Sequence, residues 1–423
     1  MAALQATCGR HCGTTAAAAA ASSRGSGRAA LAAHPRDTWS FGPAAKPPRQ
    51  PAVTLRVQAA AADQQQQQQE EQQQRERTVP TRRLSSQEAI EALYASQHTA
   101  QRETYASFYS SELGGIVTDP ALMVVQLDDH MLHRGHGVFD TSLLVDGHLY
   151  QLDQHLARLL TSAARAAIPL PDGLSVEQMK RTILETAAAS CKLNGHVRFW
   201  LSAGRGGFGL SGSECLNSAF YCVVYTHEKG EEKLDEYLRG WRVKTSPVPI
   251  KAPFFAGLKS NNYLPNVLNL MDAEAEGFDQ GIFVDADGNV AEGPNMNMAC
   301  LLDDGTLVVP PFDSCLAGIT IQRMMQLLPG AIQGGMEGIR RFEQRPVSVA
   351  EAQAAREVFF VGSSLPVMPV VQWNEKLIGD GTVGIVALQV RVMLQNDSKP
   401  RDGSDQHIEV PYGYLTGMMP DDE

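Results

Sequence analysis

The sequence has few cysteines, no excess of basic residues and no long apolar run. Seven cysteines among 423 residues are too few for a disulfide-stabilised scaffold. Acidic residues outnumber basic ones by 47 to 36, and the net charge of −11 argues against a general nucleic-acid-binding protein, which needs a basic face. No stretch of about 18 uncharged apolar residues occurs, so no membrane-spanning helix is predicted. We therefore expect neither nucleic acid nor a membrane as a partner.

Residues 1–60 differ in composition from the rest of the chain. They contain seven basic residues and a single acid, Asp37, together with many alanines and serines. This composition is typical of a transit peptide and predicts import into the plastid stroma, with the mitochondrion second; an alanine-rich disordered tail is the alternative. Residues 61–84 are rich in glutamine and predict a low-complexity linker, because such a segment cannot form a buried core.

Turn and cap signals predict short strands and helices in the remaining chain. Asp146-Gly147 lies between two apolar runs, which is a strong signal for a β-hairpin. Ser85 and Glu88 have the spacing of a capping box and predict the start of a helix. Residues 122–127 are mostly apolar and predict a strand.

Strands and helices are mixed along the chain, and hairpins recur. This order favours mixed or antiparallel sheets over a doubly wound parallel sheet, so we predict an α+β fold. The predicted organisation is a small N-terminal domain over residues 85–226, a large domain over residues 227–395 and a polar tail over residues 396–423.

Gly204 to Gly209 match the glycine pattern of dinucleotide-binding folds. That pattern binds a pyrophosphate only where a helix begins directly behind it, and here a polar turn and a strand-like run follow. We interpret the segment as a loop at the rim of a site. The cysteines lack the paired spacing of metal ligands, and no metal site is predicted.

Two separate residues have the chemistry to bind an aldehyde and a pyridine ring. Lys259 lies in a Gly- and Asn-rich segment before an apolar-faced helix, and partial burial there would lower its pKa and make the amine nucleophilic. Glu292 ends an apolar strand and precedes Gly293-Pro294, where a buried carboxylate needs a cationic partner such as a protonated pyridine nitrogen. A solvated lysine and a salt bridge to an arginine are the ordinary alternatives.

Two further segments suit a phosphate. Arg158 lies on a helix with an apolar face, and its guanidinium can bind a phosphate through two hydrogen bonds. Ile319 and Thr320 begin another helix, whose first N–H groups and hydroxyl form an anion site, and Ser363 can add a hydroxyl. A solvated helix charge and an ordinary N-cap are the alternatives. A phosphate, a pyridine nitrogen and an aldehyde-binding lysine together describe pyridoxal phosphate.

The chain resembles the class IV pyridoxal-phosphate-dependent aminotransferases, which include branched-chain aminotransferases, D-amino-acid aminotransferases and 4-amino-4-deoxychorismate lyases. The resemblance covers roughly residues 105–395, and it is most similar to the plastid D-amino-acid aminotransferases of plants and algae. The segments that carry it are Arg134-Gly135-His136-Gly137-Val138-Phe139-Asp140, His155 to Leu159, Lys259, Ala291 to Asn297, Leu316 to Thr320, and Ser363.

The resemblance implies a two-domain fold of type IV, a homodimer, and pyridoxal 5′-phosphate as the cofactor. Lys259 would be the catalytic residue, which forms an aldimine with the cofactor and then moves a proton at the substrate Cα. Glu292 would bind the pyridine nitrogen. The phosphate would be bound by the remaining cofactor residues, Arg158, Ile319, Thr320 and Ser363.

The segment that binds the substrate carboxylate departs from the family pattern. Bacterial D-amino-acid relatives end the matching strand with Thr-Arg-Gly, whereas this chain has Ser202-Ala203-Gly204. The candidates for the missing cation are Arg134, Arg205 and Arg198. Asp140 stands where many relatives carry a glutamate.

We therefore expect a transaminase that passes the amino group of D-Ala or D-Asp-like donors to 2-oxoglutarate. The alternatives are a 4-amino-4-deoxychorismate lyase that yields 4-aminobenzoate and pyruvate, and a branched-chain aminotransferase. A cofactor-free interaction protein is a fourth possibility, and the presence of Lys259, Glu292 and Arg158 argues against it.

Overall fold

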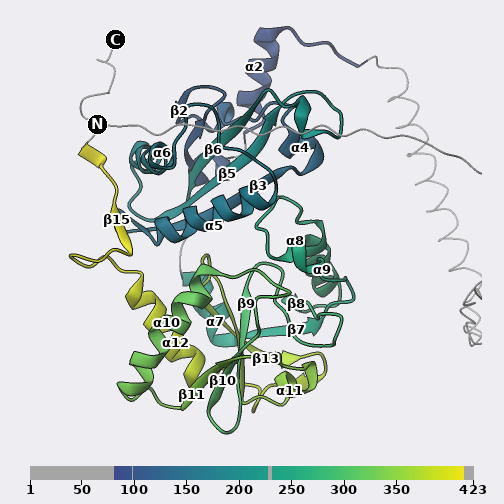
Figure 1. The fold of residues 1–423 in the computed structure, drawn as a ribbon, viewed down its shortest axis with the longest axis vertical. Coiled ribbons are helices and arrows are strands. Elements are labelled where there is room, and N and C mark those ends of the chain that lie inside the picture. Colours follow the sequence, from purple (N-terminus) through teal and green to yellow (C-terminus); the bar gives the residue numbers. More distant parts are fainter. Residues whose placement is uncertain (1–80, 98, 227–230, 414–423) are drawn as a thin grey trace, which may run out of the picture. The chain divides into compact units, whose positions relative to one another are not determined.

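The computed structural model describes residues 81–97, 99–226 and 231–413. The expected transit peptide and most of the expected linker lie outside these residues. From Leu84 on, the described chain forms one compact unit that contains two sheets (Figure 1). None of the helices in this part of the chain has the length and apolarity that crossing a membrane requires.

The first sheet is antiparallel throughout, with the strand order β15-β4-β3-β5-β6-β1-β2. The predicted hairpin at Asp146-Gly147 is confirmed, since it joins β3 and β4 with φ angles of 45° and 76°. The strands are β1 (Tyr105–Ser110), β2 (Gly115–Val117), β3 (Gly137–Val145), β4 (His148–Tyr150), β5 (Gly195–Arg205), β6 (Asn217–Tyr225) and β15 (His407–Glu409).

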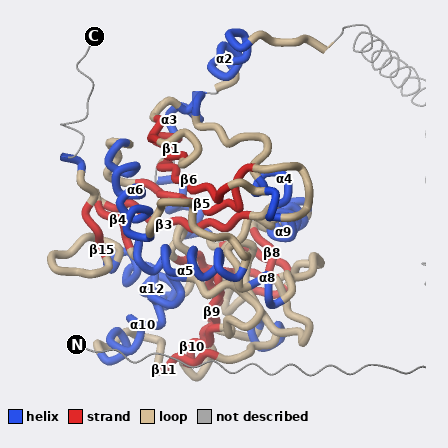
Figure 2. Tube along the Cα trace, turned by 45° about the horizontal axis from the view of Figure 1, so that its top comes forward, coloured by secondary structure: helices blue, strands red, loops and turns tan. Residues whose placement is uncertain are grey.

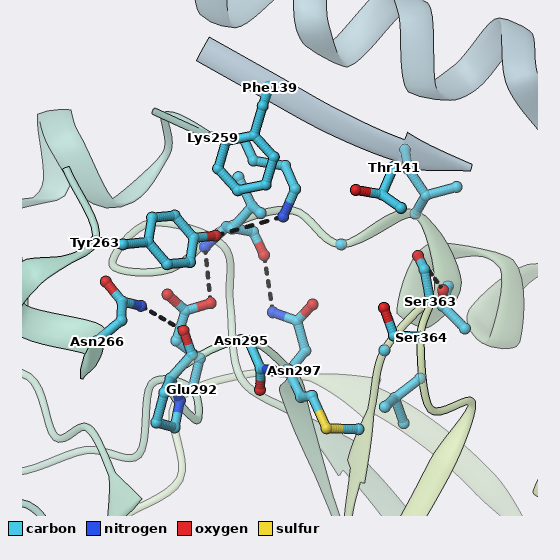
Figure 3. A pocket seen from close by; sticks show the side chains of 18 of the residues that line it. Phe139, Thr141, Lys259, Tyr263, Asn266, Glu292, Asn295, Asn297, Ser363 and Ser364 are labelled. Atoms are coloured by element: carbon cyan, nitrogen blue, oxygen red, sulfur yellow. Dashed lines mark hydrogen bonds between the residues drawn. The ribbon is translucent and has the colours of Figure 1, made fainter. Parts of the chain in front are cut away.

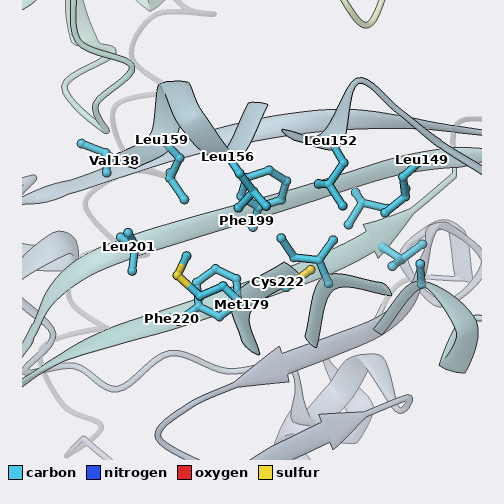
Figure 4. Packing of buried hydrophobic residues seen from close by; sticks show 14 of the residues in the cluster. Val138, Leu149, Leu152, Leu156, Leu159, Met179, Phe199, Leu201, Phe220 and Cys222 are labelled. Atoms are coloured by element: carbon cyan, nitrogen blue, oxygen red, sulfur yellow. The ribbon is translucent and has the colours of Figure 1, made fainter. Parts of the chain in front are cut away.

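Two helices cover one face of this sheet. α5 (Leu152–Arg165) packs on β3 and β5, and α6 (Val176–Ala189) packs on β1, β5 and β6. Leu156 and Leu159 of α5 and Met179 of α6 share one buried cluster with Phe199 of β5 (Figure 4). This burial of apolar side chains fixes α5 against β3.

The segments before β3 are short and partly irregular. The predicted capping box at Ser85 and Glu88 is confirmed at the start of α2 (Ser86–Ala95). The predicted strand over residues 122–127 is wrong: Asp119 caps a 3-10 turn, η1 (Pro120–Leu122), and the following loop packs apolar side chains against the sheet without pairing. The other short helices before β3 are α3 (Thr99–Thr104) and α4 (His130–Arg134). A second 3-10 turn, η2 (Gly212–Glu214), lies between β5 and β6.

The second sheet is mixed, with the order β11-β10-β9-β12-β13-β7-β8 and with β14 beside β13. The pairs β10–β11, β13–β7 and β7–β8 are parallel and the others antiparallel. Its strands are β7 (Trp241–Thr245), β8 (Gln280–Ile282), β9 (Asn297–Leu301), β10 (Thr306–Val309), β11 (Arg341–Gln344), β12 (Glu357–Val361), β13 (Val367–Trp373) and β14 (Lys376–Leu377).

Six helices accompany the second sheet in the described part of the chain, and α10 and α12 lie against each other (Figure 2). Antiparallel and mixed sheets with helices confirm the predicted α+β class. The helices are α7 (Glu231–Arg239), α8 (Pro253–Ala256), α9 (Leu264–Ala275), α10 (Ile319–Gln333), α11 (Val349–Gln353) and α12 (Ile385–Asp397).

The described chain returns to the first sheet after α12. Asp397, the last residue of α12, accepts hydrogen bonds from Arg323 of α10 at 2.7 and 2.8 Å and from the hydroxyl of Tyr150 in β4. Residues 407–409 then add β15 beside β4, and the neighbouring Val410 is buried in the α5 cluster. The sequence placed these residues in a polar tail, and the predicted domain limits stay predictions.

Candidate active site

A cavity of about 540 Å³ is lined by residues from both sheets (Figure 3). All the residues predicted to bind the cofactor line this cavity, although they are spread over more than 200 positions of the sequence. They are Arg158, Lys259, Glu292, Ile319, Thr320 and Ser363. One of the three arginines predicted to bind substrate, Arg198, also lines it.

The wall from the first sheet is set by the register of β3 and β5. Phe139 lies opposite Trp200, and Thr141 lies opposite Arg198. Since side chains two apart on a strand share a face, these four side chains form one surface, and all four line the cavity. Figure 3 shows Phe139 and Thr141 directed from β3 into it.

Lys259 is held by backbone pairing with β3. β4 covers only residues 143–145 of β3, so the edge beside residues 137–139 is open to another partner. The loop between α8 and α9 takes this edge: Phe139 N donates to the carbonyl of Lys259 at 2.9 Å, and Asn261 N donates to the carbonyl of Gly137 at 3.0 Å. The position of the lysine is therefore fixed by the first sheet.

The amine of Lys259 is buried between aromatic rings. Its Nζ lies 4.9 Å from the ring centre of Phe139 and donates to the hydroxyl of Tyr263 at 3.5 Å. Burial, and then the nearby charge of Arg158, lower the pKa of Lys259 to about 8. With this pKa roughly a tenth of the amine is unprotonated at pH 7, far more than for a solvated lysine, and the unprotonated form is the one that attacks a carbonyl group.

Glu292 is a buried carboxylate with few partners. Its side chain accepts one hydrogen bond, from Leu316 N at 3.2 Å, and it forms no ion pair within the described part of the chain. Burial raises the pKa of Glu292 to about 7, against the opposing charge of Lys251. A carboxylate in this state has room for a further donor, because an ionised carboxylate accepts several hydrogen bonds.

Arg158 reaches the cavity from α5 and is fixed by Asp140. Its Nε and Nη2 each donate to the Asp140 carboxylate at 2.7 Å, and His155 Nδ1 lies 2.7 Å from the same carboxylate. Asp140 is fully buried, and although burial alone raises a carboxyl pKa, the Arg158 guanidinium holds the pKa of Asp140 well below its usual range. The ion pair thus remains charged at neutral pH.

The start of α10 provides an anion site. Gly318 is the N-cap and makes no side-chain cap bond, and Ile319 and Thr320 begin the helix. N–H groups in a first helical turn lack partners within the helix and carry the positive end of its dipole. The Thr320 hydroxyl lies 3.0 Å from that of Ser363, so two hydroxyls join these N–H groups at the cavity.

The three arginines predicted to bind substrate have different surroundings. Arg198 donates from Nε to the Thr141 hydroxyl at 3.0 Å, and its guanidinium lies over the Phe139 ring at 5.2 Å. Arg134 is exposed and donates to the carbonyls of residues 208 and 209. Arg205 pairs with Asp128 at 2.9 Å. Neither Arg134 nor Arg205 is among the described residues that line the cavity.

Sequence reasoning missed two residues at this site. Asp140 was noted only as a departure from glutamate, although a single acid in the apolar run of β3 needs a buried cationic partner, and this was an available signal. Lys251 precedes α8 and lines the cavity, with Nζ 5.1 Å from the Tyr263 ring centre. No sequence pattern distinguishes it from a solvated lysine.

Pyridoxal 5′-phosphate fits this set of groups. Its phosphate matches the N–H groups and hydroxyls at α10 together with Arg158, and its pyridine N–H matches the donor-poor carboxylate of Glu292. Its aldehyde matches the buried amine of Lys259.

Comparison with known proteins gives an independent result. Residues 137–373 match the model of the family described as amino-transferase class IV. The chain is 43% identical over 330 residues to the chloroplastic D-amino-acid transaminase of Arabidopsis thaliana, an alignment that covers 78% of this chain and 85% of the relative. It is 25% identical over 278 residues to the branched-chain-amino-acid aminotransferase of Escherichia coli K12, covering 63% and 85% of the two chains.

Solved structures show the same fold. The branched-chain amino acid aminotransferase of Escherichia coli superposes with a TM-score of 0.64 at 22% identity, covering 72% of this chain and 99% of the other. The branched-chain aminotransferase of Thermobaculum terrenum in its pyridoxal-phosphate form gives 0.62 at 18% identity, covering 73% and 99%.

Asp140→Asn should destabilise the protein by on the order of 3 kcal/mol, because it leaves the half-buried Arg158 without its ionic partner. Since the folded-state pKa of Asp140 is depressed, its contribution is present above the unfolded pKa of about 3.9 and is lost as the pH falls further. Urea unfolding at several pH values measures both effects. Asp153→Asn, which removes an exposed partner of Lys180, should cost less than about 1 kcal/mol, and equal losses would contradict the prediction.

The rate at which the apoprotein captures pyridoxal phosphate should rise with pH and level off above about 8. The free amine is the nucleophile, and burial lowers the pKa of Lys259 to about 8. Stopped-flow absorbance between about pH 6 and about pH 11.5 measures the midpoint. A midpoint near 10.5, the ordinary lysine value, would show that the amine is solvated.

Proposed function

The chain belongs to the class IV aminotransferases, whose cofactor is pyridoxal 5′-phosphate, and from this premise we propose that it transfers the amino group of D-amino acids to 2-oxoglutarate. D-Ala and D-Asp-like compounds are the proposed donors. The observation that carries the proposal is the gathering of a buried amine, a donor-poor carboxylate and an anion site in one cavity. The name of the Arabidopsis relative supports the choice of D-amino acids.

Lys259 is the proposed catalytic residue. When bound, pyridoxal phosphate supplies an aldehyde that reacts with amines and a ring that accepts an electron pair from the substrate Cα. With the cofactor bound, Lys259 would hold its aldehyde through Nζ, and the free amine would then serve as the base that moves the proton from the substrate Cα to the cofactor carbon C4′. Its lowered pKa supports both roles, because a general base works best with a pKa near the working pH.

Glu292 and the anion site hold the cofactor at its two ends. The Glu292 carboxylate attracts a proton to the pyridine nitrogen, and the ion pair that results stabilises both charges in a buried place. Arg158, Thr320, Ser363 and the N–H group of Ile319 bind the phosphate. Residues that fix both ends of the cofactor would also fix its orientation toward Lys259, and such positioning lowers the entropic part of the barrier.

Arg198 is the proposed cation for the substrate carboxylate. Its guanidinium lies over the rings of Phe139 and Tyr225 at 5.2 and 5.6 Å, which holds its plane before a ligand arrives. Its Nε donates to the Thr141 hydroxyl, and the guanidinium also hydrogen-bonds the side chain of Tyr225. Within the described residues no carboxylate forms an ion pair with Arg198. A pre-oriented guanidinium binds a carboxylate through two hydrogen bonds.

Location and assembly are also proposed. The relative from Arabidopsis is named as chloroplastic, and this supports the plastid stroma as the location. A homodimer is supported by apolar side chains exposed on α8 and α9. More than half of the surface of each of Phe254, Leu264 and Met271 is exposed to solvent. Large apolar side chains gathered on adjacent elements are typical of subunit interfaces.

The purified protein should show a visible absorption band with pyridoxal phosphate, and D-Ala should shift this band while L-Leu leaves it unchanged. Pyruvate should accumulate beyond one equivalent per active site only when 2-oxoglutarate is added, and Lys259→Ala should lower turnover by at least about a thousandfold. A shift with L-Leu alone would replace the proposal by a branched-chain aminotransferase. A band that neither amino acid shifts would favour the lyase, and 4-amino-4-deoxychorismate would then be added as the next substrate. Without any band, the proposed function is wrong.

Arg198→Met should lower kcat/KM for D-Ala by roughly 10- to 100-fold, since a charge-assisted hydrogen-bonding group is lost. The cofactor dissociation constant should hardly change, because the phosphate and pyridine contacts remain. Steady-state kinetics of the three variants Arg198→Met, Arg134→Met and Arg205→Met compares the candidates directly. A larger loss in either of the other two would show that the carboxylate binds elsewhere.

A further inference from the structure

Residues 315–318 form a loop that contacts both ends of the proposed cofactor site. Leu316 N donates to the Glu292 carboxylate at 3.2 Å. The carbonyl of Ala317 accepts from Arg158 Nη1 at 3.2 Å. Gly318 then caps α10, whose first N–H groups belong to the anion site. A displacement of this loop would consequently move groups at the pyridine end and at the phosphate end together.

Asn297 is the side chain that holds this loop to the second sheet. It is the first residue of β9, it is paired with Val361 of β12, and only 6% of its surface is exposed. Its Nδ2 donates to the carbonyl of Leu316 at 2.8 Å (Figure 3). Because sheet pairing fixes the backbone of Asn297, this hydrogen bond sets the position of the loop relative to the sheet.

The other amide atom of Asn297 explains the glycine at position 318. A Cβ on Gly318 would lie 2.0 Å from Asn297 Oδ1, which is far inside contact distance. The φ of Gly318 is −66°, a conformation open to any residue, so backbone strain does not require a glycine here. N-caps usually carry Ser, Thr, Asp or Asn, and the close approach of Asn297 leaves no space for one.

We propose that Asn297 is a positioning residue that couples the two ends of the cofactor site through the 315–318 loop and its close contact with Gly318. The inference rests on the proposed function, because it takes Glu292 and the start of α10 as the groups that bind the pyridine and the phosphate. Asn297 holds the Leu316 N–H toward Glu292 and the start of α10 toward the phosphate in one arrangement. Neither end keeps its geometry when the hydrogen bond to Leu316 is lost.

A double-mutant cycle of Asn297→Ala, Gly318→Ala and the double variant tests the proposal. Dissociation constants of the apoproteins for pyridoxal phosphate should rise by about tenfold in each single variant, and in the double variant by little more than in Asn297→Ala alone. The reason is that, once the amide is removed, the nearest other atom to the Cβ of residue 318 is Ile321 Cγ2 at 3.4 Å, which is an ordinary contact. If the two effects multiply to about a hundredfold, the residues act independently and the proposal is wrong.

The dissociation constant for pyridoxal, which lacks the phosphate, separates the two ends. Asn297→Ala should raise the dissociation constant for pyridoxal. It should also lower the factor by which pyridoxal phosphate binds more tightly than pyridoxal. A change in one of these two quantities alone would overturn the coupling. Asn297→Asp is a second variant, with a side chain of nearly equal size that places an acceptor beside the Leu316 carbonyl. It should bind pyridoxal phosphate no more tightly than Asn297→Ala.

Gly330→Ala is the matched control, because it adds the same methyl group within α10 at a place with no atom within 4 Å. It should leave the dissociation constants unchanged, and all variants should be compared at the same degree of folding by thermal unfolding of the apoproteins. If wild-type protein binds no pyridoxal phosphate, the proposed function fails. If wild-type protein binds it and the cycle is multiplicative, only the role of Asn297 fails.

Discussion

The buried carboxylate of Asp140 is the interaction on which the arrangement of the site depends. It lies on the helix-facing side of β3, where an unpaired charge would be strongly destabilising, and it therefore requires Arg158. Arg158 in turn donates to Ala317 of the second half of the molecule. Through Arg158, this carboxylate connects β3 and α5 with the loop before α10. The proposed phosphate end of the cavity is therefore positioned by packing on the first sheet as well as by α10.

The same strand also positions the amine. Because β4 is short, the open edge of β3 pairs with the loop that contains Lys259, and no flexible side chain intervenes between sheet and lysine backbone. Burial then acts on two groups in opposite directions: it lowers the pKa of Lys259 to about 8 and raises that of Glu292 to about 7. Both groups can therefore gain or lose a proton near neutral pH, which a site for proton transfer requires.

The sequence predicted the α+β class, the first hairpin and six residues, proposed to bind the cofactor, that line the cavity, because each has a local signal or belongs to a motif. It did not predict the loop over residues 122–127, since an apolar run packs on a sheet equally well without pairing to it. The choice among the three arginines was also beyond it. Arg198 faces the cavity because of its register opposite Thr141, whereas Arg205 lies at the strand end beside Asp128. Register and ion pairing of this kind depend on residues distant in the chain.

The proposed cofactor and substrate groups lie in different parts of the molecule, and this separation is compatible with the departure at Ser202-Ala203-Gly204. The groups matched to the cofactor come from α5, from the loop before α9 and from the second sheet with α10, whereas β3 and β5 form the opposite wall with Phe139 and Arg198. A substitution on β5 can therefore move the carboxylate-binding cation along the wall without disturbing the phosphate or the pyridine contacts. On the proposed assignment, the groups for the cofactor stay in place while the register of β3 and β5 sets where the cation for the substrate carboxylate lies.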